Sequence, residues 1–497
     1  MLSDILTGMT MCLRLDVFGM LGVGVILGVI IGALPGLTAI MAVAILLPIT
    51  FFISPLVGIP FLVAITKGAI FGGSIPAILI NTPGTGAAAA TTFDGYPLAQ
   101  KGKARKALEM ALYASVIGDG LSDLITIFGI GLLAKLAMLV GSPEYFAIVL
   151  WSFSLIAVLT GESIGKGIIS AFFGLFLSTI GMDPLSGTPR YTFGILDLHA
   201  GLPDIPMIIG LFAISEIFRH SEIIEKGAAK ANEWVSKEIF KTEKPLTLKE
   251  FKECLRTILR STLIGTGIGN IPAIGQVPSA FICYSVAKAN SKHPEEFGKG
   301  SLEGVAAAES GNNAVNGSSL MPLLTFGIPG DVIAAILLSA FMVNGLRPGP
   351  NLFDTQGPMV YGILWGLFIS NIFLLALGYF LLRYVALIAR IPKFLIFPLV
   401  AALCFTGAYS VNNSLFDVLL ALVFGLIGYA MDKFKFPLAP LLITFILGPL
   451  FEETLGQSLM MSDGSLLIFL QRPVSLIFLI LTPITLIYLV KKMPKGA

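Results

Sequence analysis

Two short segments interrupt apolar sequence with proline and glycine, and both could bind an anion. They are NTPGTG (81–86) and FGIPGD (326–331). Proline removes a backbone donor and breaks a helix, whereas glycine permits the turn that follows. The helix that resumes after the break begins with unpaired N–H groups and the positive end of its dipole, which attract anions. The segments therefore predict two broken helices that meet at a site for an anionic ligand. The alternative is a pair of ordinary surface loops.

Neutral donors and glycines around these breaks supply the candidate substrate site. No arginine cluster lies in the apolar stretches, so helix ends and uncharged side chains must hold an anionic substrate. The residues that we expect to bind substrate are Asn81, Thr82, Gly84, Thr85, Asn313, Gly327 and Gly330.

A second group of residues could carry a coupling cation. Asp119 and Asp123 are four residues apart in an apolar stretch, where a carboxylate is costly and is by default a functional hypothesis. The segment ESGNNAVNG (309–317) puts amides and Glu309 on one helical face. The ion-coupling candidates are Asp119, Asp123, Asn312, Asn316 and Asp331. Three alternatives stay open, namely aspartates at the membrane interface, amides that only join helices, and Asp331 as a helix N-cap.

The remaining chemistry-bearing residues argue against an enzyme. Lys67 stands in apolar sequence, where it either contacts substrate or extends its amine to the membrane surface. The chain has no HExxH, GxSxG, Walker A or dinucleotide-binding pattern. Its four cysteines form no CxxC pair, and its three histidines are far apart. We predict no catalytic residue, no metal centre and no cofactor besides a coupling Na⁺ or H⁺.

The composition indicates that a membrane surrounds these residues. Of 497 residues, 55% are hydrophobic and 12% are charged, against roughly 25% charged in a soluble domain. Mean hydropathy is +0.89, and the net charge of +2 provides no field that would recruit nucleic acid. We predict an all-α polytopic membrane protein with roughly 10 to 13 spans. The 54 glycines and 29 prolines indicate broken or re-entrant helices.

Similar motifs that contain proline and glycine recur in the same order in both halves of the chain. GALPG (32–36) matches GNIPA (269–273), and SIPAILINTPGT (74–85) matches LMPLLTFGIPGD (320–331). Further pairs follow in the same order, all at offsets of 237 to 250 residues. This order indicates duplication, and the alternative is chance similarity between Pro/Gly-rich helix ends.

Basic residues indicate how the two repeats are oriented. Residues 100–106 hold four Lys/Arg, whereas the matched residues 346–358 hold one. From one matched pair of loops to the next, the loop richer in Lys/Arg alternates between the first and the second half. Cytoplasmic loops are enriched in Lys and Arg, so the alternation predicts repeats of inverted topology. We divide the chain into an N-terminal membrane repeat (1–218), a charged cytoplasmic linker (219–260) and a C-terminal membrane repeat (261–497).

Several long motifs resemble one transporter family. SIPAILINTPGTGAAAATTFDGYPLAQKGKARKAL (74–108), EGVAAAESGNNAVNGSSLMPLLTFGIPGD (303–331) and RYTFG (190–194) are similar to the TctA family, the large membrane subunit of tripartite tricarboxylate transporters. The resemblance extends to the segment from Leu447 to Pro473 and covers essentially the whole chain. It implies a multi-pass protein of a prokaryotic cytoplasmic membrane. It also implies a small four-span membrane subunit and a periplasmic solute-binding protein as partners.

Together these observations predict a secondary active transporter. It would import small di- or tricarboxylates such as citrate by alternating access, driven by a Na⁺ or H⁺ gradient. Two alternatives remain, namely a passive carboxylate channel and a membrane scaffold subunit whose pore a partner completes.

Overall fold

Runs of apolar residues form helices throughout the computed structural model of this chain. The structure describes residues 2–34, 36–159, 163–225, 243–272, 274–384 and 393–492. Within these ranges the only strands are β1 (Gly181–Met182) and β2 (Pro189–Arg190), an antiparallel pair. A helix satisfies its backbone hydrogen bonds internally, as lipid requires. The predicted all-α class is confirmed.

Some of the residues singled out above lie outside the described ranges. They are Pro35 and Ala273 of the two matched turns and residues 226–242 of the charged linker. Before that gap α10 extends to Glu225, and after it α12 begins at Leu248.

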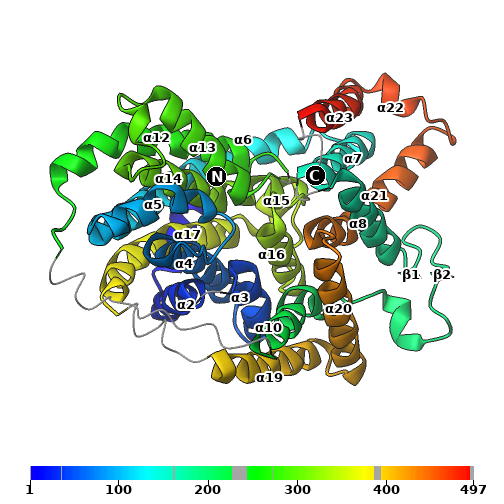
Figure 1. Cartoon of the computed structure of the whole chain (residues 1–497). Coiled ribbons are helices and arrows are strands. Elements are labelled where there is room, and N and C mark those ends of the chain that lie inside the picture. Colours follow the sequence, from blue (N-terminus) through cyan, green and yellow to red (C-terminus); the bar gives the residue numbers. More distant parts are fainter. Residues whose placement is uncertain are drawn as a thin grey trace.

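The helices are labelled in chain order (Figure 1). Those of the first half are α1 (Leu2–Cys12), α2 (Leu15–Ala33), α3 (Ala39–Leu46), α4 (Pro55–Ile80), α5 (Ala89–Gln100), α6 (Ala104–Ala137), α7 (Ser142–Leu159), α8 (Ile164–Ser178), α9 (Asp204–Ile208), the π-helix η3 (Ile209–Ile214) and α10 (Ser215–Glu225). Those of the second half are α12 (Leu248–Gly269), α13 (Gln276–Asn290), α14 (Leu302–Ser318), α15 (Leu320–Phe326), α16 (Val332–Val343), α17 (Leu352–Leu382), α19 (Lys393–Asn412), α20 (Leu415–Lys433), α21 (Leu438–Met461), α22 (Ile468–Gln471) and α23 (Pro473–Lys492). Short 3₁₀ turns are η1 (Leu47–Phe52), η2 (Leu196–Ala200) and η4 (Pro294–Glu296).

Six of the described helices are long and apolar enough to cross a membrane, namely α2, α4, α6, α17, α20 and α21. Six shorter apolar helices of 10 to 17 residues accompany them. The chain is thus a multi-pass membrane protein by length and composition. A full crossing takes about 20 residues, and the six shorter helices fall below that length. The count of roughly 10 to 13 spans therefore stays a prediction.

Glycines let the central helices pack backbone against backbone. A Cβ atom on Gly28 of α2 would lie 2.2 Å from Ile65 O of α4, and one on Gly32 would lie 2.1 Å from Ala69 O. Gly265 of α12 approaches α14 in the same way, 2.3 Å from Gly311 O. Such contacts leave no room for a side chain, so each of these helix pairs packs at close range.

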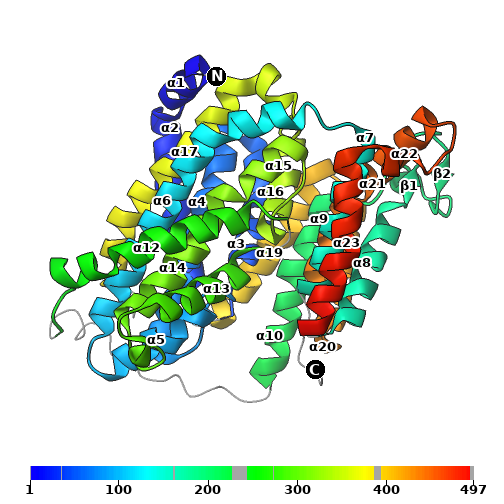
Figure 2. The same cartoon turned by 90° about the horizontal axis from the view of Figure 1, so that it is seen from above.

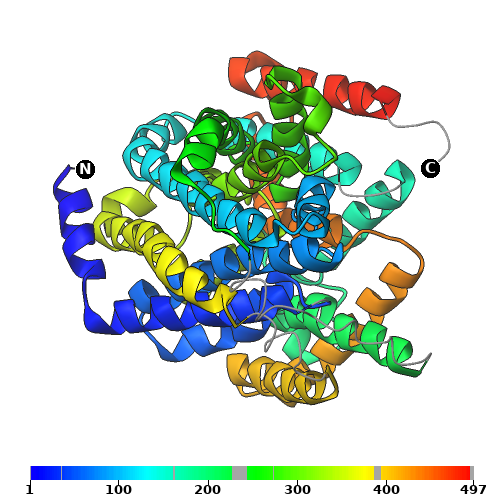
Figure 3. The same ribbon diagram turned by 60° about the vertical axis from the view of Figure 1, so that its left-hand side comes forward.

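The helices gather into two groups that stand side by side in Figure 2. The central bundle comprises α1–α6 and α12–α17, with α14 in its middle, in contact with α5, α6, α12 and α13. The side bundle comprises α7–α10 and α19–α23, where α21 packs on α8 and α20 packs on η3. Figure 3 shows the N-terminus on the central bundle and α23 at the far edge of the molecule.

Candidate functional site

The first predicted break is a turn that folds back along α4. The helix ends at Ile80, and the next residue, Asn81, caps it with a left-handed φ of 55°. The Thr82 N–H donates to Pro76 O at 3.3 Å, and the Gly84 N–H donates to Gly73 O at 3.0 Å. Asn81 and Thr82 are exposed, whereas Gly84 is buried. The break therefore presents uncharged polar groups on an accessible turn before α5 begins.

Gly84 fits only because it has no side chain. A Cβ atom there would lie 2.3 Å from Gly32 O and 2.8 Å from the Cα of Gly73. The turn thus packs closely on the backbones of both α2 and α4 at Gly84.

The second predicted break has the same construction. Gly327 ends α15 with a φ of 70°, and its N–H donates to Leu323 O at 2.9 Å. A Cβ atom on Gly330 would lie 3.0 Å from Gly269 O at the end of α12. Asp331 then starts α16 by accepting the Ala334 N–H at 2.8 Å. Of the two interpretations of Asp331, the geometry favours the N-cap.

Both breaks lie close to the start of α13. A Cβ atom on Gly86 would lie 3.0 Å from Val277 Cγ2, and one on Gly275 would lie 3.2 Å from the Cβ of Asp331. The structure therefore brings the two turns to one region, around residues 275–277. That they bind substrate there stays a prediction.

A buried ion cluster joins α4, α6 and α17. Lys67 neither contacts the surface nor extends toward it, since its side chain is 0% exposed. Its Nζ lies 2.5 Å from Asp123 Oδ2, 3.0 Å from Asp119 Oδ2 and 2.9 Å from Leu367 O. The Asn371 amide also donates to Asp123 Oδ2, at 2.7 Å. Both aspartates are buried inside the bundle, and their depth in the membrane stays a prediction.

The cluster carries more negative than positive charge. With all three side chains ionised, one lysine faces two aspartates, which leaves a net charge of −1. Within the described residues, Lys67 is the cation that both aspartates share, and Oδ1 of Asp123 has no hydrogen-bond partner. A buried carboxylate in that state calls for a proton or a monovalent cation. Uptake of one proton or one monovalent cation would make the cluster neutral.

The polar residues of α14 face two neighbouring helices. Glu309 accepts hydrogen bonds from Thr91 of α5 and, at 3.1 Å, from Ser115 of α6. The Asn313 amide donates to Ser115 Oγ at 3.0 Å and to Asn312 Oδ1 at 2.5 Å. Asn313 therefore shares a network with Glu309.

Asn316 lies on the side of α14 that faces the ion cluster and α13. Its Oδ1 accepts from the Gln276 amide at 2.6 Å. The next residue, Gly317, admits the Asp123 carboxylate, whose Oδ1 would lie 2.2 Å from a Cβ atom there. Of the five ion-coupling candidates, the structure thus groups Asp119, Asp123 and the Asn316 region, whereas Asp331 caps another helix.

A cavity of about 930 Å³ lies between the two bundles. Gly327 of the second break lines it, together with Phe326, and none of the five ion-coupling candidates does so in the described chain. Arg190 and Glu452 line the cavity from the side bundle. Their side chains form a bidentate ion pair, with Nη2 to Oε2 at 2.9 Å, and Asp183 Oδ2 lies 3.1 Å from Arg190 Nη1.

Sequence reasoning missed three parts of this site. It did not pair Lys67 with the aspartates, it omitted Asn371, and it gave Arg190 and Glu452 no role. Arg190 and Glu452 do stand in two of the motifs quoted above, RYTFG and the segment beginning at Leu447. That was the available signal. No group of three His, Cys, Asp or Glu side chains able to hold a metal occurs in the described residues.

Comparison with known proteins gives one family. The Tripartite tricarboxylate transporter TctA family matches residues 18–443. A protein of Agrobacterium vitis, described as an uncharacterized 52.8 kDa protein in the TAR-I ttuC' 3' region, is 36% identical over 457 residues, 91% of this chain and 89% of its own. A second Agrobacterium vitis protein, described by the TAR-II ttuC' 3' region, is 38% identical over 211 residues, 42% of this chain and 87% of its own. No solved structure matches.

Proposed function

Because this chain belongs to the TctA family of tripartite tricarboxylate transporters, we propose that it is a secondary active transporter for small di- and tricarboxylates. The family is one of transporters and not of enzymes, and it works as a tripartite system with other subunits. In our proposal a Na⁺ or H⁺ gradient drives import across the cytoplasmic membrane of a prokaryote. The partners are a four-span membrane subunit and a periplasmic binding protein.

The observation that carries the proposal is the charge of the Lys67–Asp119–Asp123 cluster. One positive charge has to join it before the site is neutral, and a passive channel needs no such site. The cluster contacts α14 through Gly317, and α14 continues through α15 to the second helix break. Binding of the cation is thereby linked to the turn that ends at Gly330.

In the proposal the substrate lies between the two helix breaks. The exposed Asn81 and Thr82 and the backbone N–H groups near Gly330 bind its carboxylates, as helix starts bind anions elsewhere. Asn313 then links substrate to the Glu309 network. The 930 Å³ cavity that reaches Gly327 is the path from one side of the membrane.

Inverted repeats are part of the proposal, and matched contacts support them. Gly84 rests on Gly32 O, and Gly330, 246 residues later, rests on Gly269 O. Contacts between helices match as well, because α2 packs on α4 as α12 packs on α14. Similarly, α8 packs on α21 of the other half, and α20 packs on η3. Alternating access would then move one bundle against the other.

The orientation follows from the basic residues. Figure 2 has α5, the end of α10 and the end of α23 toward one end of the molecule, and α1 with the β1–β2 hairpin toward the other. The turn after α5 holds Lys101, Lys103, Arg105 and Lys106, whereas Arg190 is the basic residue between Asp183 and Gly194. Lys and Arg concentrate on the cytoplasmic side. We assign the α5 end to the cytoplasm, and the cavity with Arg190 then opens outward.

Uptake by proteoliposomes tests the proposal. The purified chain is reconstituted, and uptake of labelled di- and tricarboxylates is measured under a Na⁺ gradient, a pH gradient or neither. We expect accumulation above equilibrium with one of the gradients. If labelled carboxylate only equilibrates across the membrane, at the same rate with and without either gradient, the protein is a passive channel instead. If no flux occurs, the same preparation is tested for stabilisation by each carboxylate, since a ligand that binds the folded state raises the unfolding midpoint. Absence of both flux and stabilisation would leave only the scaffold role.

A further inference from the structure

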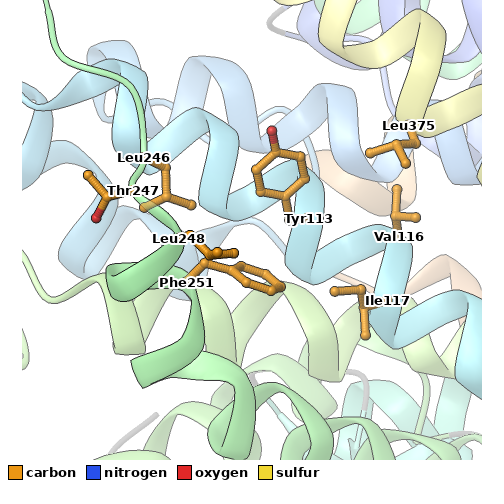
Figure 4. Close-up of a pocket in the computed structure, with 8 residues that line it drawn as sticks. All are labelled: Tyr113, Val116, Ile117, Leu246, Thr247, Leu248, Phe251 and Leu375. Atoms are coloured by element: carbon orange, nitrogen blue, oxygen red, sulfur yellow. The ribbon is translucent and has the colours of Figure 1, made fainter.

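An apolar groove lies on the outer surface of the central bundle, where α12 starts beside α6 and α17. It has a volume of about 410 Å³. Figure 4 shows the side chains that line it, all apolar or aromatic except for Thr247: Tyr113, Val116, Ile117, Leu246, Thr247, Leu248, Phe251 and Leu375. Leu248 is 67% exposed and Leu375 is 40% exposed. The groove therefore opens sideways from the bundle.

Residues 243–247, which precede α12 and border the groove, are held in place by polar contacts. The Leu246 N–H donates to Glu109 Oε2 at 2.7 Å, and the Arg105 N–H donates to Glu243 Oε2 at 2.8 Å. Phe251 contacts Tyr113 edge to face, with ring centroids 6.0 Å apart. The groove is therefore a preformed feature of the fold.

A charged depression continues from the groove at its α12 end. It has a volume of about 440 Å³ and is lined by Leu248, Lys249, Lys252 and Glu253, so Leu248 belongs to both features. Lys249 and Lys252 are exposed. Neither forms a salt bridge within the part of the chain that the structure describes. Two lysines against one glutamate leave the depression with a positive charge.

We propose that this groove and depression together bind one anionic phospholipid. An acyl chain lies along Val116, Ile117 and Leu375, and the phosphate lies against Lys249 and Lys252. From Arg105 to Ile117, α6 rises about 18 Å at 1.5 Å per residue, close to the roughly 15 Å of one leaflet of a 30 Å hydrocarbon core. Basic residues beside a groove between membrane helices suit an anionic headgroup. The lipid holds the start of α12 against α6, whatever substrate the protein carries.

Lipid retention by the full chain tests the proposal. The protein is purified in detergent with added phosphatidylglycerol or phosphatidylcholine of identical acyl chains, and bound lipid is counted by native mass spectrometry. We expect one phosphatidylglycerol per chain and much less phosphatidylcholine. Each lysine contributes about 1 kcal/mol to the binding of an anionic headgroup. Loss of both in Lys249→Gln/Lys252→Gln should therefore weaken the binding of phosphatidylglycerol about 30-fold.

Two further variants decide whether the site lies where the structure has it. Lys288→Gln/Lys292→Gln removes two exposed lysines from the α13 end on the same membrane side and should retain the lipid. Val116→Phe fills the groove and should release it while both lysines stay. Equal retention of the two lipids, loss in the Lys288/Lys292 control, or unchanged retention in either site variant would overturn the proposal.

Discussion

Replacing single members of the buried ion cluster should change stability in an order that its charge dictates. Lys67→Met leaves two buried carboxylates with no positive partner, a net charge of −2. Asp119→Asn leaves one lysine and one aspartate, a net charge of zero. The two variants remove one charge each, yet they move the cluster in opposite directions from its net charge of −1.

The distances set the magnitude. At an effective dielectric constant of about 20, an Nζ to Oδ2 separation of 2.5 Å corresponds to about 7 kcal/mol of attraction, and one of 3.0 Å to about 6 kcal/mol. Desolvation of the charges offsets much of this, and removing one partner of a buried pair costs about 3–5 kcal/mol. We expect Lys67→Met to lose that much free energy of unfolding, and Asp119→Asn to stay within about 1 kcal/mol of the wild type or to exceed it. The triple variant with Asp123→Asn added to both should recover most of the loss.

Denaturant and thermal unfolding in detergent measure these differences. Lys135→Met, on the exposed side of α6, controls for loss of a lysine from an apolar helix. The reasoning is refuted if Lys67→Met unfolds like the wild type, or if Asp119→Asn loses as much stability as Lys67→Met. In proteoliposomes Asp119→Asn should still exchange substrate across the membrane, but gradient-driven accumulation should be lost, because its cluster is neutral without a cation.

Three further predictions concern other parts of the fold. Gly84→Ala forces a Cβ atom into backbone atoms of α2 and α4 and should cost about 1–3 kcal/mol and most transport, whereas Gly86→Ala, which meets only a flexible valine side chain, should be mild in the same thermal and uptake assays. Arg190→Gln breaks a partly exposed ion pair within the side bundle, so it should cost at most about 1 kcal/mol of unfolding free energy in the same thermal assay; a loss of several kcal/mol would show that this pair holds the β1–β2 hairpin on α21. Burial acts to raise the pKa of Glu250, but hydrogen bonds from Lys106 and Thr247 lower it from 4.5 to about 2. Thr247 and Glu250 cap α12, because the Thr247 N–H donates to Glu250 Oε2 at 2.9 Å and the Glu250 N–H donates to Thr247 Oγ1 at 3.3 Å. The folded state therefore favours the ionised form of Glu250, and this cap is fully stabilising above pH 4.5 and is lost as the pH falls toward 2. Hydrogen exchange at the start of α12 should show this loss, and Glu250→Gln should abolish its pH dependence.

The features that the sequence predicted best are those that depend on neighbouring residues along the chain, namely helix ends, helix faces and a helix cap. Proline and glycine at 81–86 and 326–331 end helices by their own backbone chemistry, and both helices do end there. The four-residue spacing of Asp119 and Asp123 puts both on one side of α6, and they share one lysine. Asp331 had a readable cap signal, since it directly precedes a helix.

What the sequence did not predict depends on packing between distant segments. Lys67 finds Asp123 56 residues away only because α4 and α6 lie together. Arg190 meets Glu452 across 262 residues. The spacing of residues along the chain does not predict such pairs. The sequence therefore indicated Lys67, Asp119 and Asp123 individually, but not that they form one ion cluster.

The helix α14 has a consequence for how the protein is made. Every residue from Gly304 to Ser318 is buried, including one glutamate and three asparagines. A segment this polar does not partition into lipid by itself, because each charged residue near a helix centre opposes insertion by about 2.5–3.5 kcal/mol. During synthesis α6 and α12 precede it, and they carry the serines and glycines that receive it. The helices that α14 contacts most, α5, α6, α12 and α13, all precede it in the chain. The central helix therefore enters the bilayer against helices that are already in place, before α15–α17 complete the bundle.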